Sequence, residues 1–505
     1  MLKVVRTENG LVRGIPAADP RIISYKGIPF AAPPVGDLRW KAPQPPADWE
    51  GVRDCLEFGP IAMQNIPGLS KTDIYTREWN VDPEIPMDED CLYLNVWTPA
   101  TSPDDKLPVF VWYYGGGLQV GNPAEMEFDG ERLARRGIVV VTVNYRVNVF
   151  GFLAHPELTK EAPEAPANFG NLDQQYGLMW TKRNIAAFGG DPDNITIGGQ
   201  SAGGGSVLTQ LNCPANKPYI QKAIVESGIF LSVYEDRMRH GSLAGAEGQG
   251  ERFFEFLGVK NLEEARALPA EFIRDKNREF GGFWGTVVDG VYQDDSYMNN
   301  LYAGKLLDVP VLLGHTNNEF FAAPKADSKE ALETLAKERF GEYAEEFLTL
   351  IGADGDLDAA KQAATLPMGE AAIGFFCRRL EQLNKKGPWY YYDFGPEIPG
   401  WDNPGAFHSV DLWFFFETLA KCWRPFTGKH YDLARQMCNY WTNFIKSGDP
   451  NGDDADGTPM EHWAPYTQEA KNCMTFYEKP KAQQRECSPL VDLVIRAQLG
   501  KMAEK

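Results

Sequence analysis

A serine of this chain stands in a setting that suits a nucleophile. Residues 195–203 read Ile-Thr-Ile-Gly-Gly-Gln-Ser-Ala-Gly, and an apolar stretch typical of a helix follows. Small residues on both sides of a serine allow the chain to turn sharply and hold the hydroxyl out at the end of a strand. The Gly-x-Ser-x-Gly pattern alone is weak, but the strand before it and the helix after it supply the required context. Ser201 is therefore predicted to attack a carbonyl carbon.

A run of three glycines is predicted to supply the hydrogen-bond donors that such an attack needs. An apolar run at residues 111–114 ends in Gly115, Gly116 and Gly117, and glycine allows backbone N–H groups to approach an oxygen closely. A flexible loop and a phosphate cradle are the alternatives, but no Gly-Lys-Ser or Gly-Lys-Thr follows. We expect the N–H groups of Gly116 and Gly117, with that of Ala202, to form an oxyanion hole.

A general base is sought after Ser201, because the chain order Ser, acid, His accompanies this motif. His408 lies in a turn-rich loop after the predicted strand at residues 389–394 and is the preferred base. His155 precedes the serine, and His315 stands only four residues before the best acid. The other three histidines lie in charged or polar segments and are expected at the surface: His240, His430 and His462.

The preferred acid is Glu319, which follows the strand-like run at residues 309–314. Its neighbours Phe320 and Phe321 could shield a hydrogen bond to His408, which would hold the imidazole tautomer and stabilise the imidazolium. On position alone, a single glutamate in a loop is more often solvated. Asp289 and Asp411 are the next candidates.

Alternating strand and helix patterns are expected to position these residues. Apolar β-branched runs at residues 93–97, 109–114, 138–143 and 195–198 suit strands covered on both faces, and a helix is predicted over 172–188. Further strands are predicted at 223–226, 309–313 and 389–394. The N-terminal third reads as short β pieces with a loop at 27–36, and residues 240–385 could form a cap. No repeat or linker divides the 505 residues, so we expect one α/β domain over 1–505 with a mostly parallel sheet.

Composition excludes several classes of protein. With 50 Lys and Arg against 70 Asp and Glu, the net charge of −20 repels phosphate backbones, so nucleic acid is not an expected partner. No apolar run suits a signal peptide or a membrane span, which predicts a cytoplasmic monomer or small homo-oligomer without a membrane anchor.

The eight cysteines lack zinc-site spacing and are expected to be free, mostly buried thiols. No metal or cofactor is expected.

Several motifs along nearly the whole chain resemble those of type-B carboxylesterases, the cholinesterase/carboxylesterase family of the α/β-hydrolase fold. The closest character is that of bacterial para-nitrobenzyl-type esterases. The motifs are Gly27-Ile28-Pro29-Phe30-Ala31, Leu38-Arg39-Trp40, Glu89-Asp90-Cys91-Leu92, Gly115-Gly116-Gly117, Asn144-Tyr145-Arg146, Asp173-Gln174, Phe188-Gly189-Gly190-Asp191-Pro192, the Ser201 elbow, Asn318-Glu319 and Gly405-Ala406-Phe407-His408-Ser409.

The resemblance implies hydrolysis of carboxylic esters by Ser201, Glu319 and His408 without a cofactor. It also implies a large sheet flanked by helices, a small N-terminal β region and cap insertions. Buried ion pairs are implied between Arg39 and Glu89 and between Arg146 and Asp173. A supporting hydroxyl near Glu319 is implied at Ser227.

Two departures from the family pattern bear on function. Ala62 stands where many members have the disulfide partner of Cys91, so that disulfide is not expected, although Cys55 is near enough to leave an alternative. Gln200 replaces a glutamate that precedes the serine in many members, so we expect neutral, hydrophobic or aromatic esters rather than choline-like cations. Aromatic residues at 283–284 and 413–416 could line the pocket or belong to the core. The alternative function is an inactive, cholinesterase-like binding or adhesion module.

Overall fold

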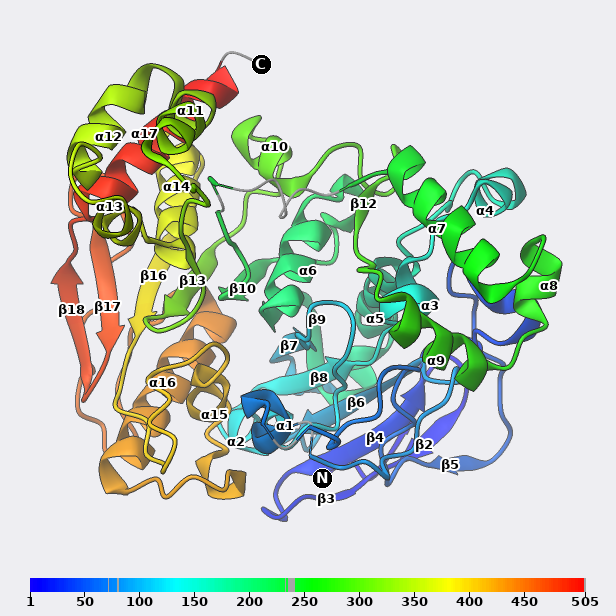
Figure 1. Cartoon of the computed structure of the whole chain (residues 1–505). Helices are drawn as coiled ribbons and strands as arrows, with labels where there is room; N and C mark the ends of the chain where they lie inside the picture. Colours follow the sequence, from blue (N-terminus) through cyan, green and yellow to red (C-terminus); the bar gives the residue numbers. More distant parts are fainter. Residues whose placement is uncertain (71, 80, 232, 235–240, 504–505) are drawn as a thin grey trace.

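A central sheet of eleven strands organises the protein, which is described here by a computed structural model covering residues 1–70, 72–79, 81–231, 233–234 and 241–503 (Figure 1). Neighbouring strands run parallel from β8 to β17 in spatial order, and the strands at both edges are antiparallel. In spatial order the strands are β18 (Pro480–Gln484), β17 (Asn472–Phe476), β16 (Trp389–Phe394), β13 (Val311–Thr316), β10 (Lys222–Glu226), β9 (Gly190–Gln200), β7 (Leu107–Tyr113), β8 (Val139–Val143), β6 (Tyr93–Thr98), β4 (Ile23–Pro29) and β3 (Ile15–Pro16).

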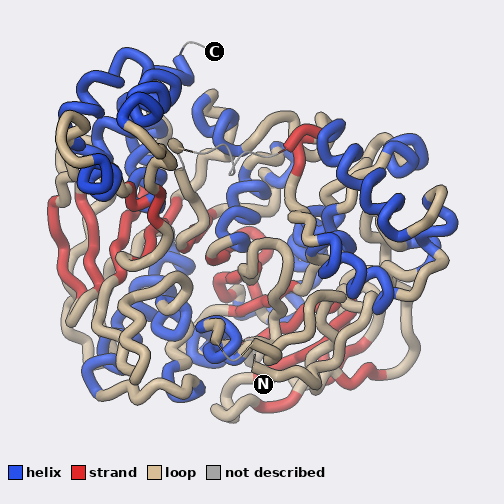
Figure 2. Tube along the Cα trace, viewed as in Figure 1, coloured by secondary structure: helices blue, strands red, loops and turns tan. Residues whose placement is uncertain are grey.

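Helices surround this sheet, as Figure 2 shows in blue around the red strands. Helix α6 contacts β7, β9 and β10, whereas α16 contacts β7 and β9. The helices are α1 (Ile74–Glu78), α2 (Glu131–Ala134), α3 (Asn148–Phe152), α4 (Pro156–Glu161), α5 (Phe169–Asn184), α6 (Ala202–Leu211), α7 (Leu243–Leu257), α8 (Leu262–Arg266), α9 (Ala270–Phe280), α10 (Tyr297–Tyr302), α11 (Lys329–Phe340), α12 (Ala344–Ile351), α13 (Leu357–Ala363), α14 (Met368–Gln382), α15 (Asp411–Phe415), α16 (Gly428–Ser447) and α17 (Pro489–Ala503).

The strand register brings the carboxyl ends of the central strands to one edge. Gln200 at the end of β9 pairs with Glu226 of β10, and Glu226 pairs with Gly314 of β13. The last residue of β13, Thr316, pairs with Phe394, the last residue of β16. Because parallel strands end side by side, the loops that follow β9, β10, β13 and β16 leave the sheet at the same edge.

The central strands agree with the runs of β-branched residues in the sequence. All five residues of β8, Val-Val-Val-Thr-Val, are buried, as expected for a strand covered on both faces. The predicted α/β-hydrolase fold with a mostly parallel sheet is confirmed. The predicted small N-terminal β region is formed by three strands, namely β1 (Val4–Arg6), β2 (Leu11–Arg13) and β5 (Val52–Asp54).

The interval 240–385 contributes both to the sheet and to the helices above its carboxyl edge. It contains β13, and most of its helices form two groups: α7 to α9 lie on the right in Figure 1, and α11 to α14 lie with α17 at the upper left, with α10 between them. Two short two-stranded sheets accompany them, one joining β11 (Gly241–Ser242) to β12 (Val287–Val288), the other β14 (Phe321–Ala322) to β15 (Leu366–Pro367).

Both predicted ion pairs are confirmed. Arg39 Nη2 lies 2.5 Å from Glu89 Oε2, and Arg146 Nη2 lies 2.7 Å from Asp173 Oδ1, with little of any of these side chains exposed. All eight cysteines are free; six are buried and two are partly exposed, so neither Cys55 nor Cys91 forms a disulfide. Within the described ranges, no helix is long and apolar enough to cross a membrane.

Candidate active site

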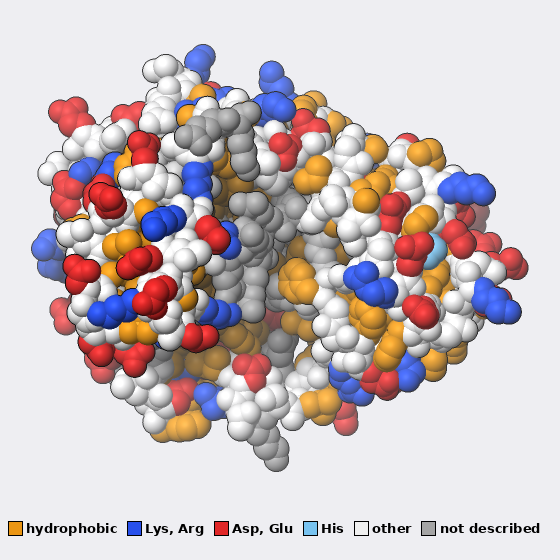
Figure 3. All heavy atoms as spheres, turned by 45° about the horizontal axis from the view of Figure 1, so that its top comes forward, with side chains coloured by type: hydrophobic (Ala, Val, Ile, Leu, Met, Phe, Trp, Pro, Cys, Tyr) orange, Lys and Arg blue, Asp and Glu red, His pale blue; other side chains and the backbone are white. Residues whose placement is uncertain are grey.

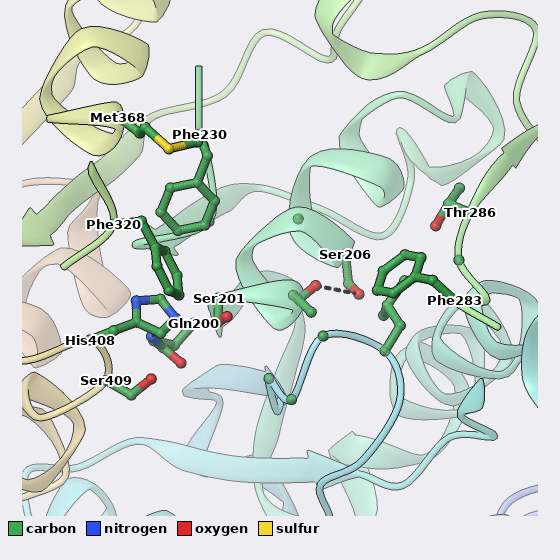
Figure 4. A pocket seen from close by; sticks show the side chains of 18 of the residues that line it. Gln200, Ser201, Ser206, Phe230, Phe283, Thr286, Phe320, Met368, His408 and Ser409 are labelled. Atoms are coloured by element: carbon green, nitrogen blue, oxygen red, sulfur yellow. Dashed lines mark hydrogen bonds between the residues drawn. The ribbon is translucent and has the colours of Figure 1, made fainter. Parts of the chain in front are cut away.

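A pocket of about 1670 Å³ opens at the edge where the central strands end. Its lining combines residues that follow five different strands, including Gly116, Ser201, Gly228, Phe320 and His408. Figure 3 shows the hollowed face, and Figure 4 shows Ser201 and His408 side by side in the pocket, with Phe283 on the opposite wall. The fold therefore gathers the predicted nucleophile, base and oxyanion-hole residues around one space.

Ser201 occupies a sharp turn between β9 and α6. Its backbone φ of 56° and ψ of −125° are unfavourable for a residue with a side chain, and such strain is common at functional sites. The turn needs glycine on both sides: a Cβ at Gly199 would lie 2.3 Å from the oxygen of Gly203, and one at Gly203 would lie 2.1 Å from the oxygen of Tyr113. The Ser201 N–H donates to the Glu226 oxygen at 2.9 Å, which anchors the turn to β10.

The three-glycine loop passes directly beside the serine. A Cβ at Gly115 would come within 3.1 Å of the Ser201 Cβ, so the lack of a side chain permits this approach. Gly116 and Gly117 have φ values of +100° and +65°, which favour glycine. Within the described part of the chain, the N–H groups of Gly116 and Gly117 donate to no other protein group. These donors line the pocket and remain available to a substrate oxygen.

His408 and Glu319 form a buried hydrogen-bonded pair. His408 Nδ1 lies 2.6 Å from Glu319 Oε2, and the two side chains are 7% and 4% exposed. Their loops are joined by the backbone N–H of Asn318, which donates to the oxygen of Ala406 at 3.2 Å. The Phe320 ring lies 4.6 Å from the imidazole, centre to centre, and shields the pair as expected from the sequence. Phe321 follows it and is half exposed.

The second nitrogen of His408 faces an amide. His408 Nε2 lies 3.3 Å from Nε2 of Gln200, the residue before the serine, and Gln200 is buried. Among the described residues, the Ser201 hydroxyl has no hydrogen-bond partner, although it lies in the same pocket. Hydrogen bonds of a catalytic group are often long or poorly aligned before substrate binds, so this resting geometry is compatible with Ser201 as the nucleophile.

Ser227 directly follows β10 but makes no hydrogen bond to Glu319. Its φ is 43°, and its N–H donates to the Gly314 oxygen at 2.8 Å. The Ser227 Oγ and Glu319 Oε1 atoms are both buried, and neither has a hydrogen-bond partner among the described residues. The expected support of Glu319 by Ser227 is therefore not a direct hydrogen bond in this structure.

Both alternative acids are engaged elsewhere. Asp411 accepts a hydrogen bond from the Tyr392 hydroxyl at 2.9 Å, and burial raises its pKa to about 6. Asp289 accepts from the Asn168 amide at 2.8 Å and from the Gln293 N–H at 2.9 Å.

The remaining histidines lie outside the predicted triad. His155 is buried and stacks on Phe254, and His315 lies within β13 and bonds to the Tyr391 hydroxyl at 2.8 Å. The expectation that His430 lies at the surface is wrong, because this residue is buried at the start of α16. His462 is exposed as expected, and His240 falls outside the described residues.

The candidate aromatic residues divide between pocket and core. Phe283 and Trp284 line the pocket, whereas the run at 413–416 is fully buried and packs with the core. Phe230 also lies beside the base, with its ring 5.8 Å from that of His408, although the sequence does not single it out. A lone phenylalanine in the loop after β10 carries no signal that would have identified it.

Two further glutamates of the pocket wall are not singled out by the sequence: Glu127 is buried and Glu125 is partly exposed. Glu125 and Glu127 follow the glycine loop, where charged residues are ordinarily solvated. Burial raises the pKa of Glu125 to about 7, and burial together with the negative charge of Glu125 raises the pKa of Glu127 well above its ordinary value. In the part of the chain that the structure describes, no group of three or more His, Cys, Asp or Glu side chains could hold a metal ion.

Known proteins share this architecture over nearly the whole chain. The chain is 32% identical to the para-nitrobenzyl esterase of Bacillus subtilis, covering 96% of this chain and 98% of that protein. It is 30% identical to a mouse cholinesterase, covering 96% and 85%. A solved carboxylesterase of Geobacillus stearothermophilus superposes with a TM-score of 0.76 at 29% identity, covering 97% of this chain and 99% of that one. The model of the Carboxylesterase family matches residues 2–490, and the chain therefore belongs to that family of ester hydrolases.

Proposed function

We propose that this enzyme cleaves neutral carboxylic esters through an acyl-enzyme intermediate, with Ser201 as nucleophile, His408 as general base and Glu319 as the acid that orients the base. The observation that carries the proposal is the 2.6 Å contact between His408 Nδ1 and Glu319 Oε2, beside Ser201 in one pocket. A carboxylate only accepts hydrogen bonds, so this contact assigns a proton to Nδ1, and in the neutral ring Nε2 then carries a lone pair. A base of that tautomer is the one that serine activation requires.

In the proposed reaction, Ser201 Oγ attacks the ester carbonyl while His408 Nε2 takes the hydroxyl proton. The oxygen that becomes negative is held by the N–H groups of Gly116, Gly117 and Ala202, which supply charge stabilisation where it is needed. The imidazolium then donates its proton to the departing alcohol oxygen. Water, activated by the same imidazole, releases the acid and restores the serine.

The pocket lining supports neutral, hydrophobic or aromatic esters as substrates. Aromatic side chains lie on both sides of Ser201, from Phe230 and Phe320 near the base to Phe283 and Trp284 on the far wall. Gln200 places a neutral amide, and no charge, next to the serine. Glu125 and Glu127 also lie in the pocket wall, where burial raises the pKa of both carboxyls and so weakens the negative charge that they would offer a cation.

We further propose that the chain acts as one domain over 1–505, in which residues 240–385 provide a cap around the site. Residues of this interval on both sides of the pocket support the cap assignment. Phe283 lines one side, with Gln249 bonded to its backbone oxygen, whereas Phe320 and Met368 lie on the side of His408.

Covalent labelling tests the assignment of the nucleophile. A fluorophosphonate should add to Ser201, and Ser201→Ala should abolish both labelling and ester hydrolysis without altering the fold. Ser206→Ala is a matched control, because this hydroxyl also lines the pocket but donates to the Ala202 oxygen at 2.9 Å. Peptide mapping that places the label on another serine, or a fully active Ser201→Ala enzyme, would refute the proposal. An unlabelled but folded wild-type protein would favour the binding-module alternative.

A further inference from the structure

The Gln200 side chain is fixed between the candidate base and the oxyanion loop. Its amide nitrogen lies 3.3 Å from His408 Nε2. Its amide oxygen points toward Gly115, because a Cβ built on that glycine would lie 3.2 Å from Gln200 Oε1. Gln200 is the last residue of β9 and pairs with Glu226 of β10. The residue is only 2% exposed. A buried side chain in this position has few other orientations.

The chemistry of the contact follows from the other side of the imidazole. Glu319 accepts a hydrogen bond from Nδ1–H, so Nε2 of the neutral ring carries a lone pair and can only accept. The amide N–H of Gln200 is a donor, so the observed orientation matches donor to acceptor. When the ring gains a proton, Nε2 becomes a donor and the same contact places two N–H groups against each other. The amide in this orientation therefore stabilises the neutral ring selectively.

We propose that Gln200 is a positioning residue for the base: its amide N–H holds Nε2 of the neutral imidazole in the resting enzyme and keeps His408 able to accept the serine proton at more acidic pH. This proposal rests on the proposed function. No covalent step is added, since the proton still passes from Ser201 Oγ to Nε2, and the amide contact loosens as Nε2 turns to the serine. Glutamate at this position would act in the opposite sense, because its negative charge stabilises the imidazolium.

Other ionisable groups around His408 set the background for this effect. Glu319 contacts Nδ1 directly, and Asp411, three residues along the chain, interacts electrostatically with both His408 and Glu319. Glu226 interacts electrostatically with Asp411. The pKa of Tyr75 is raised mainly by burial, then by the negative charges of Asp73 and Glu319, so Tyr75 also lies near the acid. The rings of Phe320 and Phe230 cover the imidazole. None of these groups changes in the comparison below.

The test compares the pH dependence of kcat/KM in three enzymes with a neutral substrate, para-nitrophenyl acetate. Gln200→Met removes the donor with little change in size, and Gln200→Glu replaces it with a carboxylate of the same shape. We expect the midpoint of the acid limb to be lowest in the wild type and higher in Gln200→Met. In Gln200→Glu it should be higher still, by about 1–3 pH units relative to wild type, the usual range for one adjacent charge.

Gln249 offers a matched control. It lines the same pocket, but its amide donates to the Phe283 oxygen at 2.9 Å, across the pocket from His408. Gln249→Glu should therefore leave the acid-limb midpoint unchanged, whatever it does to kcat. A shift equal to that of Gln200→Glu would mean that any charge in the pocket suffices and would overturn the proposal.

Two outcomes distinguish a failure of this inference from a failure of the proposed function. Equal acid-limb midpoints in wild type and both Gln200 variants, with fluorophosphonate still labelling Ser201, would overturn the positioning role alone. Loss of labelling in a folded wild-type enzyme would overturn the function itself. If Gln200→Glu does not fold, Gln200→Met decides the question: a midpoint equal to that of the wild type refutes the proposal, and a raised midpoint supports it.

Discussion

Arg146 binds the carboxylate of Asp173 with both its guanidinium group and its backbone N–H. The guanidinium binds both carboxylate oxygens, with Nε 2.8 Å from Oδ2 and Nη2 2.7 Å from Oδ1, and the Arg146 backbone N–H donates to Oδ2 at 3.0 Å. Arg146 lies in the loop after β8, and Asp173 lies in the first turns of α5. The pair therefore joins a helix to the part of the sheet next to β7, which leads into the three-glycine loop.

Loss of one partner should be costly because the other charge would remain buried. Asp173→Asn should lower the free energy of unfolding by about 3–5 kcal/mol. The midpoint of urea-induced unfolding measures this change. Asp193→Asn is a matched control, because Asp193 pairs with Lys182 at 2.7 Å while its side chain is 83% exposed, and its loss should cost less than about 1 kcal/mol. Equal midpoints for the two variants would contradict the structural role assigned to the buried pair.

Two glycines on one helix should respond oppositely to the same substitution. At Gly203, a Cβ would lie 2.1 Å from the Tyr113 oxygen, a backbone atom that cannot move away alone. At Gly205, the nearest atom to an added Cβ is 3.8 Å away. Gly203→Ala should therefore abolish fluorophosphonate titration and reduce soluble yield, whereas Gly205→Ala should be at least as stable as wild type, since alanine favours helix by about 1 kcal/mol. A stable, titratable Gly203→Ala enzyme would show that the elbow has room to relax.

Much of the positioning framework was predictable from the sequence because it depends on local patterns. The run at 389–394 is aromatic except for Asp393 and forms β16 with the predicted bounds. Apolar patterning marks the outer strands poorly: β17 and the edge strand β18 were not predicted, and β18 carries Lys481, Gln483 and Gln484 on a largely exposed strand. The predicted loop over 27–36 also begins too early, because β4 continues to Pro29.

Side-chain environments were less predictable because they depend on residues far apart in the chain. His430 looked solvated in a polar segment, yet the first turn of α16 buries it and its Nε2 contacts the Glu397 oxygen at 3.1 Å. The contact between Gln200 and His408 joins residues that are 208 positions apart. Sequence spacing can identify the two residues, but it does not show which atom of the amide faces the ring.

The Glu125 and Glu127 carboxyls should make stability depend on pH. Their folded-state pKa values are raised from 4.5, so their contribution to stability is present below that value and is lost as pH rises toward and beyond about 7. Both oxygens of Glu127 lack hydrogen-bond partners among the described residues, which leaves a charge at that position unsupported. Glu127→Gln replaces the acid with a neutral donor toward Glu125 and should raise the unfolding midpoint at pH 8.5 more than at pH 5.5.

The control for this pH dependence is Glu333→Gln, a change of the same kind at an exposed position on α11. It should leave the difference between the two midpoints unaltered. If Glu127→Gln behaves like this control, the carboxyls do not titrate as a buried pair in the folded protein.

The contact between Glu319 and His408 predicts how the rate responds to loss of one charge. Glu319→Gln keeps the shape of the side chain, so the fold should remain, but the amide cannot compensate the imidazolium and can favour the wrong tautomer. The equivalent acid-to-amide change in a serine protease lowers kcat about 10⁴-fold, and a loss approaching this size is expected here. His408→Ala should leave little activity and remove the acid limb of the pH profile. Single-turnover kinetics with para-nitrophenyl acetate measures the acylation step directly.

Ser227 and Asp411 lie near the Glu319–His408 contact and provide control variants that leave both of its partners unchanged. Ser227→Ala removes a hydroxyl that has no hydrogen-bond partner in the described structure, and Asp411→Asn retains an oxygen able to accept from Tyr392. Both should slow acylation far less than Glu319→Gln, because neither group orients the imidazole. A large loss in Asp411→Asn together with near-normal acylation in Glu319→Gln would assign the role of the acid to Asp411. The 2.6 Å distance from Glu319 to Nδ1, with Asp411 bound to Tyr392, favours the opposite result.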